Sequence, residues 1–188
     1  MKALKSLRLH IGLFGRTNVG KSSFLNKITN QAISIVSDTA GTTTDVVEKS
    51  MELLPIGPVT FLDTAGLDDT SQLGALRIEK TQKILNRCDI AVLITDKNEL
   101  TSIENNIIEK FKNLNIPYLI IINKQDNNLD IKSDFMVTST VTDNKIVEKF
   151  KAELIKILPE DFINSPKIVG DLVDTKSTVI LVIPIDKE

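Results

Sequence analysis

An unbroken match to one phosphate-binding pattern constrains this chain more than any other feature. Residues 15–22 read GRTNVGKS and fit GxxxxGK[ST] without a mismatch. The segment follows a hydrophobic run at Leu7–Phe14 and opens a helix-like segment at Lys21–Thr29, the strand–loop–helix context that this pattern requires. Glycines let such a loop wrap phosphate oxygens, with its amides and the positive helix end pointing inward. A chance glycine turn would not be expected to combine this spacing with this context.

Two side chains of the loop have distinct expected roles. Lys21 would reach the β- and γ-phosphates of a nucleoside triphosphate, and the Ser22 hydroxyl would bind Mg²⁺. The other nucleotide contacts expected here are Asn18, Val19, Gly20 and Ser23.

Strand-like runs alternate with helix-period segments along the rest of the chain, which is typical of a mostly parallel sheet covered on both faces. The predicted strands are Leu7–Phe14, Val46–Leu54, Val59–Leu62, Ile90–Thr95, Tyr118–Ile122 and Phe135–Thr138. The predicted helices are Lys21–Thr29, Gly74–Arg87, Ser102–Leu114 and Asp143–Leu158. We therefore predict an α/β fold of the P-loop NTPase type (a Ras-like G domain), with a mostly parallel six-stranded sheet and one antiparallel edge strand. A turn at residues 55–58 makes Val46–Leu54 that antiparallel strand.

The end of the predicted domain is marked by a change in sequence character. Asp143 is predicted to cap the last helix, whose buried stripe would comprise Val147, Phe150, Leu154 and Leu158. Residues 1–159 then form the nucleotide-binding domain. Residues 160–188 are predicted to be a linker and the start of an incomplete second domain, because the strand-like run Val179–Ile185 has no evident partner in the first.

Composition excludes several classes of function. With 23 Lys and Arg against 25 Asp and Glu, the chain has no basic field that would hold nucleic acid. The single cysteine, Cys88, excludes an internal disulfide and cannot alone hold zinc or an iron–sulfur cluster. No apolar run is long enough for a membrane span or signal peptide, so we expect a cytoplasmic protein. Cys88 is interpreted as a small apolar filler, His10 as a strand histidine with satisfied hydrogen bonds, and Glu104 with Lys110 as a solvated helix face.

Two segments near the loop are candidates for sensing the γ-phosphate. DTAG at residues 63–66 closes a predicted strand, so Asp63 would hold Mg²⁺ through a water and the Gly66 amide would bond the γ-phosphate. Upstream, one hydroxyl of GTTT at residues 41–44 would complete the Mg²⁺ shell. The two segments are expected to order with triphosphate and relax after hydrolysis, as in a molecular switch.

A third motif predicts the choice of base. Residues 123–126 read NKQD and follow the strand Tyr118–Ile122, at the edge where α/β sheets bind ligands. Asp126 would accept hydrogen bonds from N1–H and the 2-amino group of guanine, which adenine lacks, and such pairing discriminates by about 10⁴-fold. The Lys124 stem would cover the base beside Asn123. Backbone amides of Ser139 and Thr140 would bond guanine O6.

The order GRTNVGKS, GTTTD, DTAG, NKQD and then Ser139 resembles the translation-factor-related GTPases that include Era, Der and MnmE, over about Arg8 to Leu158. The segments RLHIGLFGRTNVGKSS, IVSDTAGTTTD, KSMELLPIGPV and LGALRIEKT are similar to the HydF family, the GTPases that mature [FeFe]-hydrogenase. Of these segments MELLPIGPV is the most discriminating, because Era, Der and MnmE would be expected to differ there.

The resemblance implies roles for single residues. Thr43 would be the switch threonine on Mg²⁺ and act in catalysis with Lys21 and Gly66. Asn18 matches the asparagine that binds an activating K⁺ in MnmE-like proteins. The other K⁺ ligands would be Thr42 and the carbonyls of Ser37 and Thr39. The alternative for Asn18 is that its side chain only braces the loop.

The chain also departs from the pattern of these families. Leu67 stands where many small GTPases have a water-orienting glutamine, and Gly74 stands near the place of the catalytic glutamate of MnmE. Asp68, Asp69 and Gln72 remain as candidates, although a solvated switch loop explains them equally well. We therefore expect GTP hydrolysis to be slow.

Two further departures concern segments rather than single residues. Asp126 to Phe135 is too short for the helix that this fold usually places there. HydF-like proteins continue into a dimerisation domain, and the resemblance implies that residues 160–188 are the linker and start of that domain. A cluster domain with cysteine and histidine ligands follows in those proteins, so no iron–sulfur cluster is expected in these 188 residues.

Three functions remain open from the sequence. In the first, the chain is a GTP-hydrolysing switch that acts on hydrogenase maturation proteins or on the rest of its own scaffold, with a homodimer as one assembly. In the second, it is a docking module that binds its partner according to whether nucleotide is bound, and hydrolysis is incidental. The third function is an Era- or Der-like GTPase of ribosome assembly or tRNA modification, which predicts an RNA-binding domain and a basic surface.

Overall fold

The computed structural model describes residues 8–31, 47–64, 81–126 and 135–159, together with Phe162, Thr178 and Ile180. The strands are β1 (Leu9–Phe14), β2 (Val47–Leu53), β3 (Gly57–Asp63), β4 (Ile90–Thr95), β5 (Tyr118–Ile122) and β6 (Met136–Val137). The helices are α1 (Lys21–Gln31), α3 (Ser102–Asn113) and α4 (Ile146–Lys156), and residues 81–85 are also helical.

The six strands form one sheet in the order β2-β3-β1-β4-β5-β6. β1 pairs in parallel with β3 and β4, and β5 pairs in parallel with β4 and β6. Among the described strands only β2 runs antiparallel, at the edge beside β3. This arrangement confirms the predicted α/β fold of a P-loop G domain, and it brings the carboxyl ends of β1, β3, β4 and β5 to one edge, where such sheets bind ligands.

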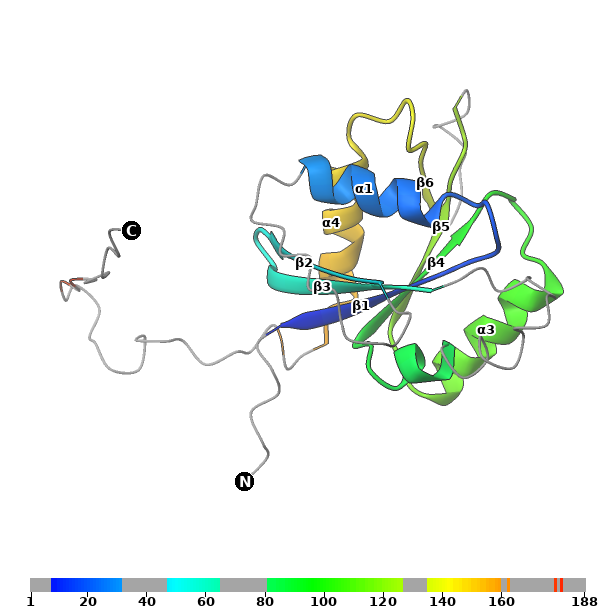
Figure 1. The fold of residues 1–188 in the computed structure, drawn as a ribbon, viewed down its shortest axis with the longest axis horizontal. Helices are drawn as coiled ribbons and strands as arrows, with labels where there is room; N and C mark the ends of the chain where they lie inside the picture. The colour runs from blue at the N-terminus through cyan, green and yellow to red at the C-terminus, as the bar shows by residue number, and fades with distance from the viewer. Residues whose placement is uncertain are drawn as a thin grey trace.

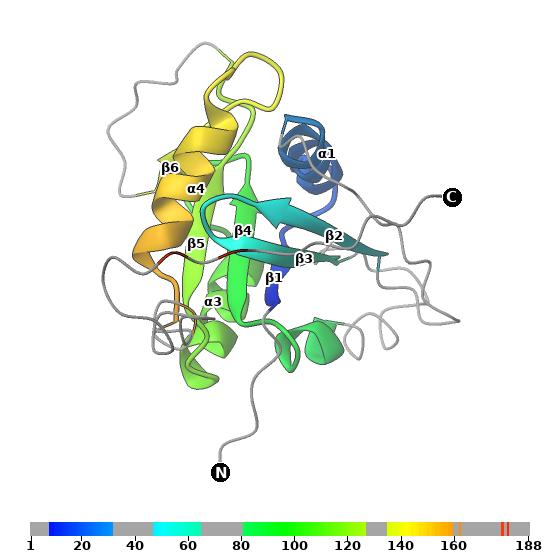
Figure 2. The same ribbon diagram turned by 90° about the vertical axis from the view of Figure 1, so that its left-hand side faces the viewer.

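Helices cover both faces of the sheet (Figures 1 and 2). On one face α1 and α4 pack on the strands, and the Phe24 and Phe150 rings lie 5.3 Å apart. On the other face α3 packs on the strands, and the Phe14 and Phe111 rings lie 5.0 Å apart. Because the central strands are covered on both sides, every residue of β4 is buried, which explains its unbroken apolar sequence.

The predicted element boundaries hold to within two residues for most elements. β4 and β5 have the predicted bounds. β3 begins at Gly57, two residues earlier than predicted, because Gly57 already pairs with Leu53 across the hairpin. The predicted helix Gly74–Arg87 is described only from residue 81, where residues 81–85 are helical.

The predicted capping role of Asp143 is wrong. α4 begins at Ile146, and Lys145 occupies the cap position without a side-chain hydrogen bond. Asp143 lies two residues too early and is 4% exposed. Its carboxylate accepts hydrogen bonds from the Lys145 amide (2.9 Å), Lys149 Nζ (2.8 Å) and Thr138 Oγ1 (3.1 Å). The residue therefore braces the loop before α4 and does not cap the helix.

The predicted stripe of α4 is confirmed in its centre. Phe150 and Leu154 are fully buried, and Val147 and Leu158 pack on the same core while partly exposed. Phe162 also packs against this core. The predicted strand Val179–Ile185 lies outside the described residues except for Ile180, which is 82% exposed, and the boundary at 159/160 stays a prediction. Among the described helices none has the length and apolar character to cross a membrane.

Candidate nucleotide-binding site

The phosphate loop between β1 and α1 has a backbone that only glycine accommodates at two positions. Gly15 has φ +151° and Gly20 has φ +97°. A Cβ at Gly15 would lie 2.3 Å from the Ile94 carbonyl oxygen, and a Cβ at Gly20 would lie 2.3 Å from Asn123 Nδ2. The two glycines therefore let the loop pass close to β4 and to the NKQD segment.

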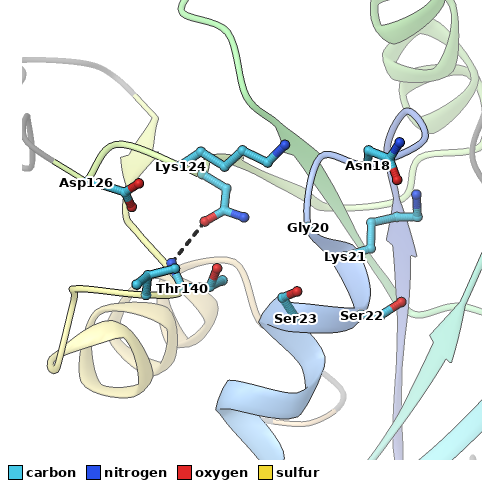
Figure 3. A pocket seen from close by; sticks show the side chains of 10 residues that line it. Asn18, Gly20, Lys21, Ser22, Ser23, Lys124, Asp126 and Thr140 are labelled. Carbon is cyan, nitrogen blue, oxygen red and sulfur yellow. Dashed lines mark hydrogen bonds between the residues drawn. The ribbon is translucent and has the colours of Figure 1, made fainter.

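Lys21 lies across this loop. Its side chain is 8% exposed, and Nζ donates to the carbonyl oxygens of Gly15 (3.0 Å) and Arg16 (2.9 Å). The ammonium is thus held over the loop by the loop's own backbone, at one end of the pocket (Figure 3). A fixed ammonium at the N-terminus of α1 suits a phosphate group.

Ser22 and Asp63 meet next to Lys21. Ser22 Oγ donates to Asp63 Oδ2 at 3.3 Å. Asp63 Oδ1 is buried and has no hydrogen-bond partner among the described residues. Burial raises the pKa of the Asp63 carboxyl, although the nearby positive charge of Lys21 acts to lower it. A hydroxyl and a carboxylate with an unpaired oxygen are ligands that fit Mg²⁺, so these two residues are able to hold that ion.

Asn123 joins the two ends of the site. Its side chain is fully buried, Nδ2 donates to the Val19 carbonyl (2.9 Å), and Oδ1 accepts from the Thr140 amide (3.1 Å). We expected the Thr140 amide to face guanine O6, but in this structure it donates to Asn123. We call residues 123–126 together with residues 139–142 the base loop. Asn123 therefore positions the base loop against the phosphate loop.

The Ser139 hydroxyl organises the base end. It donates to the Asp126 carboxylate and accepts from the amides of Val141 (3.1 Å) and Thr142 (3.0 Å). Asp126 itself is exposed and lines the pocket, on the side away from Lys21 (Figure 3). Ser139 therefore orients the carboxylate that is expected to select the base. The predicted role of Ser139 was a different one, a hydrogen bond from its backbone amide to guanine O6.

These residues enclose one pocket of about 480 Å³, within the range of small-molecule sites. It is lined by Asn18, Gly20, Lys21, Ser22, Ser23, Asn123, Lys124, Asp126, Thr140 and Val141. Val19 and Ser139 are buried behind this lining. The remaining predicted residues lie outside the described ranges: Ser37, Thr39, Thr42, Thr43, Gly66, Leu67, Asp68, Asp69, Gln72 and Gly74.

The interpretation of Glu104 as a solvated residue is wrong. It is fully buried on α3, Oε1 accepts from Arg16 Nε (3.1 Å), and Oε2 accepts from the Thr101 amide (2.8 Å). Burial would raise the pKa of this carboxyl, but hydrogen bonds from Thr101, Thr95 and Arg16 hold it below its usual value. The sequence carried a signal for this, since Thr101 and Glu104 have capping-box spacing, which the structure shows. Lys110 is exposed, as expected.

The structure agrees with the interpretation of His10 as a strand histidine with a partner and of Cys88 as a small buried side chain. The His10 amide donates to Asp89 Oδ2 (2.9 Å), and the imidazole Nδ1 lies 3.5 Å from the same oxygen. Cys88 is 9% exposed, and burial raises its pKa to about 12. Within the described ranges no group of three His, Cys, Asp or Glu side chains is placed to hold a metal ion.

Comparison with known proteins agrees with this site. Residues 10–124 match the family model described as 50S ribosome-binding GTPase. The chain is 43% identical over 119 residues to the tRNA modification GTPase MnmE of Prochlorococcus marinus (strain NATL1A), covering 63% of this chain and 25% of MnmE. It is 36% identical over 132 residues to GTPase Der of a Nitratiruptor species, covering 66% of this chain and 28% of Der.

Solved structures give the same result. The fold is similar to that of a variant of Aquifex aeolicus Era bound to GDP.AlF4-, with a TM-score of 0.62 and 25% identity over 81% of this chain and 57% of Era. The chain spans about a quarter of the length of the curated relatives that it matches. It belongs to the family described as 50S ribosome-binding GTPases and is a GTP-binding, GTP-hydrolysing G domain of the Era, Der and MnmE type.

Proposed function

We propose that this G domain is a slow GTPase switch of a HydF-type scaffold for [FeFe]-hydrogenase maturation, and that GTP lies in the pocket between Lys21 and Asp126. The observation that carries the nucleotide part is a pocket that has a phosphate-binding lysine at one end and an oriented carboxylate at the other. The maturation part is supported by the segments MELLPIGPV and LGALRIEKT.

In this proposal each end of the pocket has its own task. Lys21 neutralises charge on the β- and γ-phosphates, while Ser22 and Asp63 hold Mg²⁺, which would shield the developing charge on the transferred phosphoryl group. Thr43 and Gly66 close on the γ-phosphate from the two switch segments. Their part in the proposal rests on the sequence motifs, since both lie outside the described residues.

The base contact has a sharp test in Asp126→Asn. The amide has an N–H that donates to the 2-oxo group of xanthine, whereas guanine has an amino group there, so GTP affinity should fall by about 100-fold or more while xanthosine triphosphate affinity rises. Calorimetric titration of both nucleotides with Mg²⁺ measures this. Glu99→Gln, which neutralises an exposed carboxylate before α3, is the matched control and should bind GTP normally. Unchanged GTP affinity in Asp126→Asn would contradict the assigned pocket.

We also propose K⁺ activation at Asn18, with Thr42 and the Ser37 and Thr39 carbonyls as further ligands. Support comes from Asn18 itself, whose side chain is exposed at the pocket next to Lys21, with φ +63° (Figure 3). A cation there would stand against the phosphates in the place of an arginine finger. GTP turnover should be at least about 10-fold faster in KCl than in NaCl, given the size of arginine-finger effects, and Asn18→Ala should remove the difference. Equal turnover in the two salts would favour the docking-module function instead.

A second candidate function has its own support. The 43% identity to MnmE and 36% identity to Der favour a GTPase of tRNA modification or ribosome assembly. The near balance of 23 basic and 25 acidic residues speaks against nucleic acid as a direct partner of these residues. Reading the gene beyond Glu188 separates the candidates. Downstream cysteines and a histidine support maturation, with maturation proteins or a second copy as partners, whereas a basic RNA-binding domain supports the second function.

A further inference from the structure

Arg16 belongs to the phosphate loop by sequence but not to the pocket by structure. Its neighbours Asn18, Gly20 and Lys21 line the pocket, while Arg16 is absent from the lining. Its side chain is 16% exposed and turns to the α3 side of the sheet, where Nε donates to the buried Glu104 and Nη2 to Asp96. Two nitrogens of the guanidinium, Nε and Nη2, are therefore engaged by carboxylates, so the arginine is committed to protein contacts.

We propose that Arg16 is a positioning residue for nucleotide binding, and that Glu104, Asp96 and Lys124 complete a charge network which fixes the phosphate loop and the base loop relative to each other. This inference rests on the proposed nucleotide site. We call these four residues the Arg16 network.

The first link of the Arg16 network leads to the phosphate end. The carbonyl oxygen of Arg16 accepts a hydrogen bond from Lys21 Nζ at 2.9 Å. Because the side chain of Arg16 is held by two carboxylates, its carbonyl is held as well, and the Lys21 ammonium is kept at one place over the loop. An arginine fork is suited to this task because its planar geometry loses little freedom for each hydrogen bond formed.

The second link leads to the base end. Asp96 follows β4 and receives Arg16 on Oδ1, while Lys124 Nζ lies 3.7 Å from its Oδ2. Lys124 has φ +62° and its side chain extends from the NKQD segment toward the phosphate loop (Figure 3). Asp96 thus lies between Lys124, which is expected to cover the base, and Arg16, which holds the phosphate loop.

Glu104 anchors the network to the core. It is fully buried on α3, and the amide and hydroxyl of Thr101 donate to its Oε2 at 2.8 and 2.7 Å. A buried acid with these donors stays ionised and keeps one orientation, so Arg16 has a fixed partner. The network alternates two acids and two bases, so it carries no net charge. Lys124 lines the pocket, but Arg16, Asp96 and Glu104 do not, so the effect of these three residues on affinity must come from positioning.

Measurement of GDP affinity in folded variants tests this inference. Arg16→Lys keeps the charge but cannot bridge both carboxylates in the same way, and Asp96→Asn removes the shared acid. If each change reduces the correctly arranged fraction to about one tenth, GDP with Mg²⁺ should bind about 10-fold more weakly. The double variant should be no more than slightly weaker than either single variant, because both changes disrupt one unit. Glu109→Gln, an exposed acid on the same helix, is the matched control and should bind like the wild type.

The readout separates positioning from a general loss of stability. A residue that only stabilised the fold would lower the melting temperature without changing the Kd of protein that circular dichroism shows to be folded. Wild-type affinity in folded Arg16→Lys and Asp96→Asn would overturn the inference, and so would a double variant whose loss equals the product of the two single losses. If Arg16→Lys does not fold, Asp96→Asn alone decides, since the Asp96 side chain is 28% exposed. Failure of the wild type itself to bind GDP would overturn the proposed site together with this inference.

Discussion

The phosphate loop and the base loop of this site are built in different ways. The phosphate loop is shaped mainly by backbone, because Gly15 and Gly20 adopt positive φ and carbonyl oxygens of the loop hold Lys21. The base loop is shaped mainly by side chains, because Asn123 and Ser139 hold it through hydrogen bonds of their amide and hydroxyl groups.

This difference decides how each loop should respond to mutation. A backbone-shaped loop is sensitive wherever an added Cβ is not tolerated, even if no functional group is lost. A side-chain-shaped loop is sensitive where a polar group with several partners is removed, because each buried partner then loses its hydrogen bond. The comparison can be tested by changing one residue of each kind beside a matched control.

Gly20→Ala should have the largest effect. The added Cβ would meet Asn123 Nδ2 at 2.3 Å, and φ +97° is strained for any residue with a Cβ. We expect GDP affinity to fall by about 100-fold, or about 2.7 kcal/mol, because the clash displaces both loops at their point of contact. Calorimetric titration with Mg²⁺ gives the affinity, and urea unfolding gives the stability of the same sample.

Gly57→Ala separates the clash from the backbone strain. Gly57 has a similar φ, +108°, but is the first residue of β3, after the β2–β3 turn, with no atom within 4 Å of an added Cβ. Both variants should lose about 1–3 kcal/mol of stability through strain, and only Gly20→Ala should lose nucleotide affinity. Equal GDP affinity of the two variants would contradict a phosphate loop shaped by close approach to Asn123.

Asn123→Ala tests the side-chain half of the comparison. The change removes a fully buried amide that links the Val19 carbonyl to the Thr140 amide, so about 1–3 kcal/mol of stability should be lost for the groups left without partners. We expect GDP affinity to fall by roughly 10- to 30-fold, because a loop arranged correctly only about 3–10% of the time lowers affinity in proportion.

Asn105→Ala is the matched control for this change. Asn105 is exposed on α3, and its amide makes one long hydrogen bond, of 3.4 Å, to the Leu100 carbonyl. Its removal should leave stability within about 0.5 kcal/mol and GDP affinity unchanged. A loss in Asn123→Ala no greater than this would show that backbone shapes the base loop as well.

The two loops also differ in how far sequence could predict them. GRTNVGKS is contiguous and its geometry follows from glycine positions, so the strand, loop and helix around it were predictable from local pattern. The parallel sheet and its antiparallel edge followed in the same way, from buried runs such as β4 and from the turn before Gly57.

What sequence did not predict depends on contacts between distant segments. Arg16 and Glu104 are 88 residues apart, and Asn123 and Val19 are 104 residues apart, so no local pattern pairs them. The helix-capping preference of aspartate gave a wrong prediction for Asp143, because its carboxylate accepts hydrogen bonds from the side chains of Thr138 and Lys149 and does not cap the helix. Side-chain networks of this kind are determined by tertiary packing, which periodicity and capping preferences do not contain.

Asp143→Asn should have the smallest effect on nucleotide binding and the clearest pH signature. The Asp143 carboxylate accepts a hydrogen bond from Thr138 Oγ1 (3.1 Å), next to Ser139 of the base loop. Because the change acts on the base loop only through this neighbour, it should weaken GDP binding by only about 3-fold, the effect of a hydrogen bond worth under about 1 kcal/mol. Burial would raise the pKa of this carboxyl, but hydrogen bonds from Lys149, Lys145 and Thr138 hold it below its usual value. Since the folded pKa is the lower one, the ionised group stabilises the fold at neutral pH. That stabilisation is lost as the pH falls from about 4 through the lowered value.

Wild type should therefore be more stable than Asp143→Asn at pH 7, and the difference should shrink in acid. Melting temperatures of both proteins between pH 7 and the onset of acid unfolding measure it. Glu153→Gln breaks an ion pair of similar length, 2.7 Å to Lys156 against 2.8 Å for Asp143 and Lys149, but on the surface of α4. Exposed pairs contribute about 0–1 kcal/mol, so this control should give a small difference with little pH dependence. A stability difference for Asp143→Asn that is constant with pH would show that packing of the side chain, and not its charge, braces the base loop.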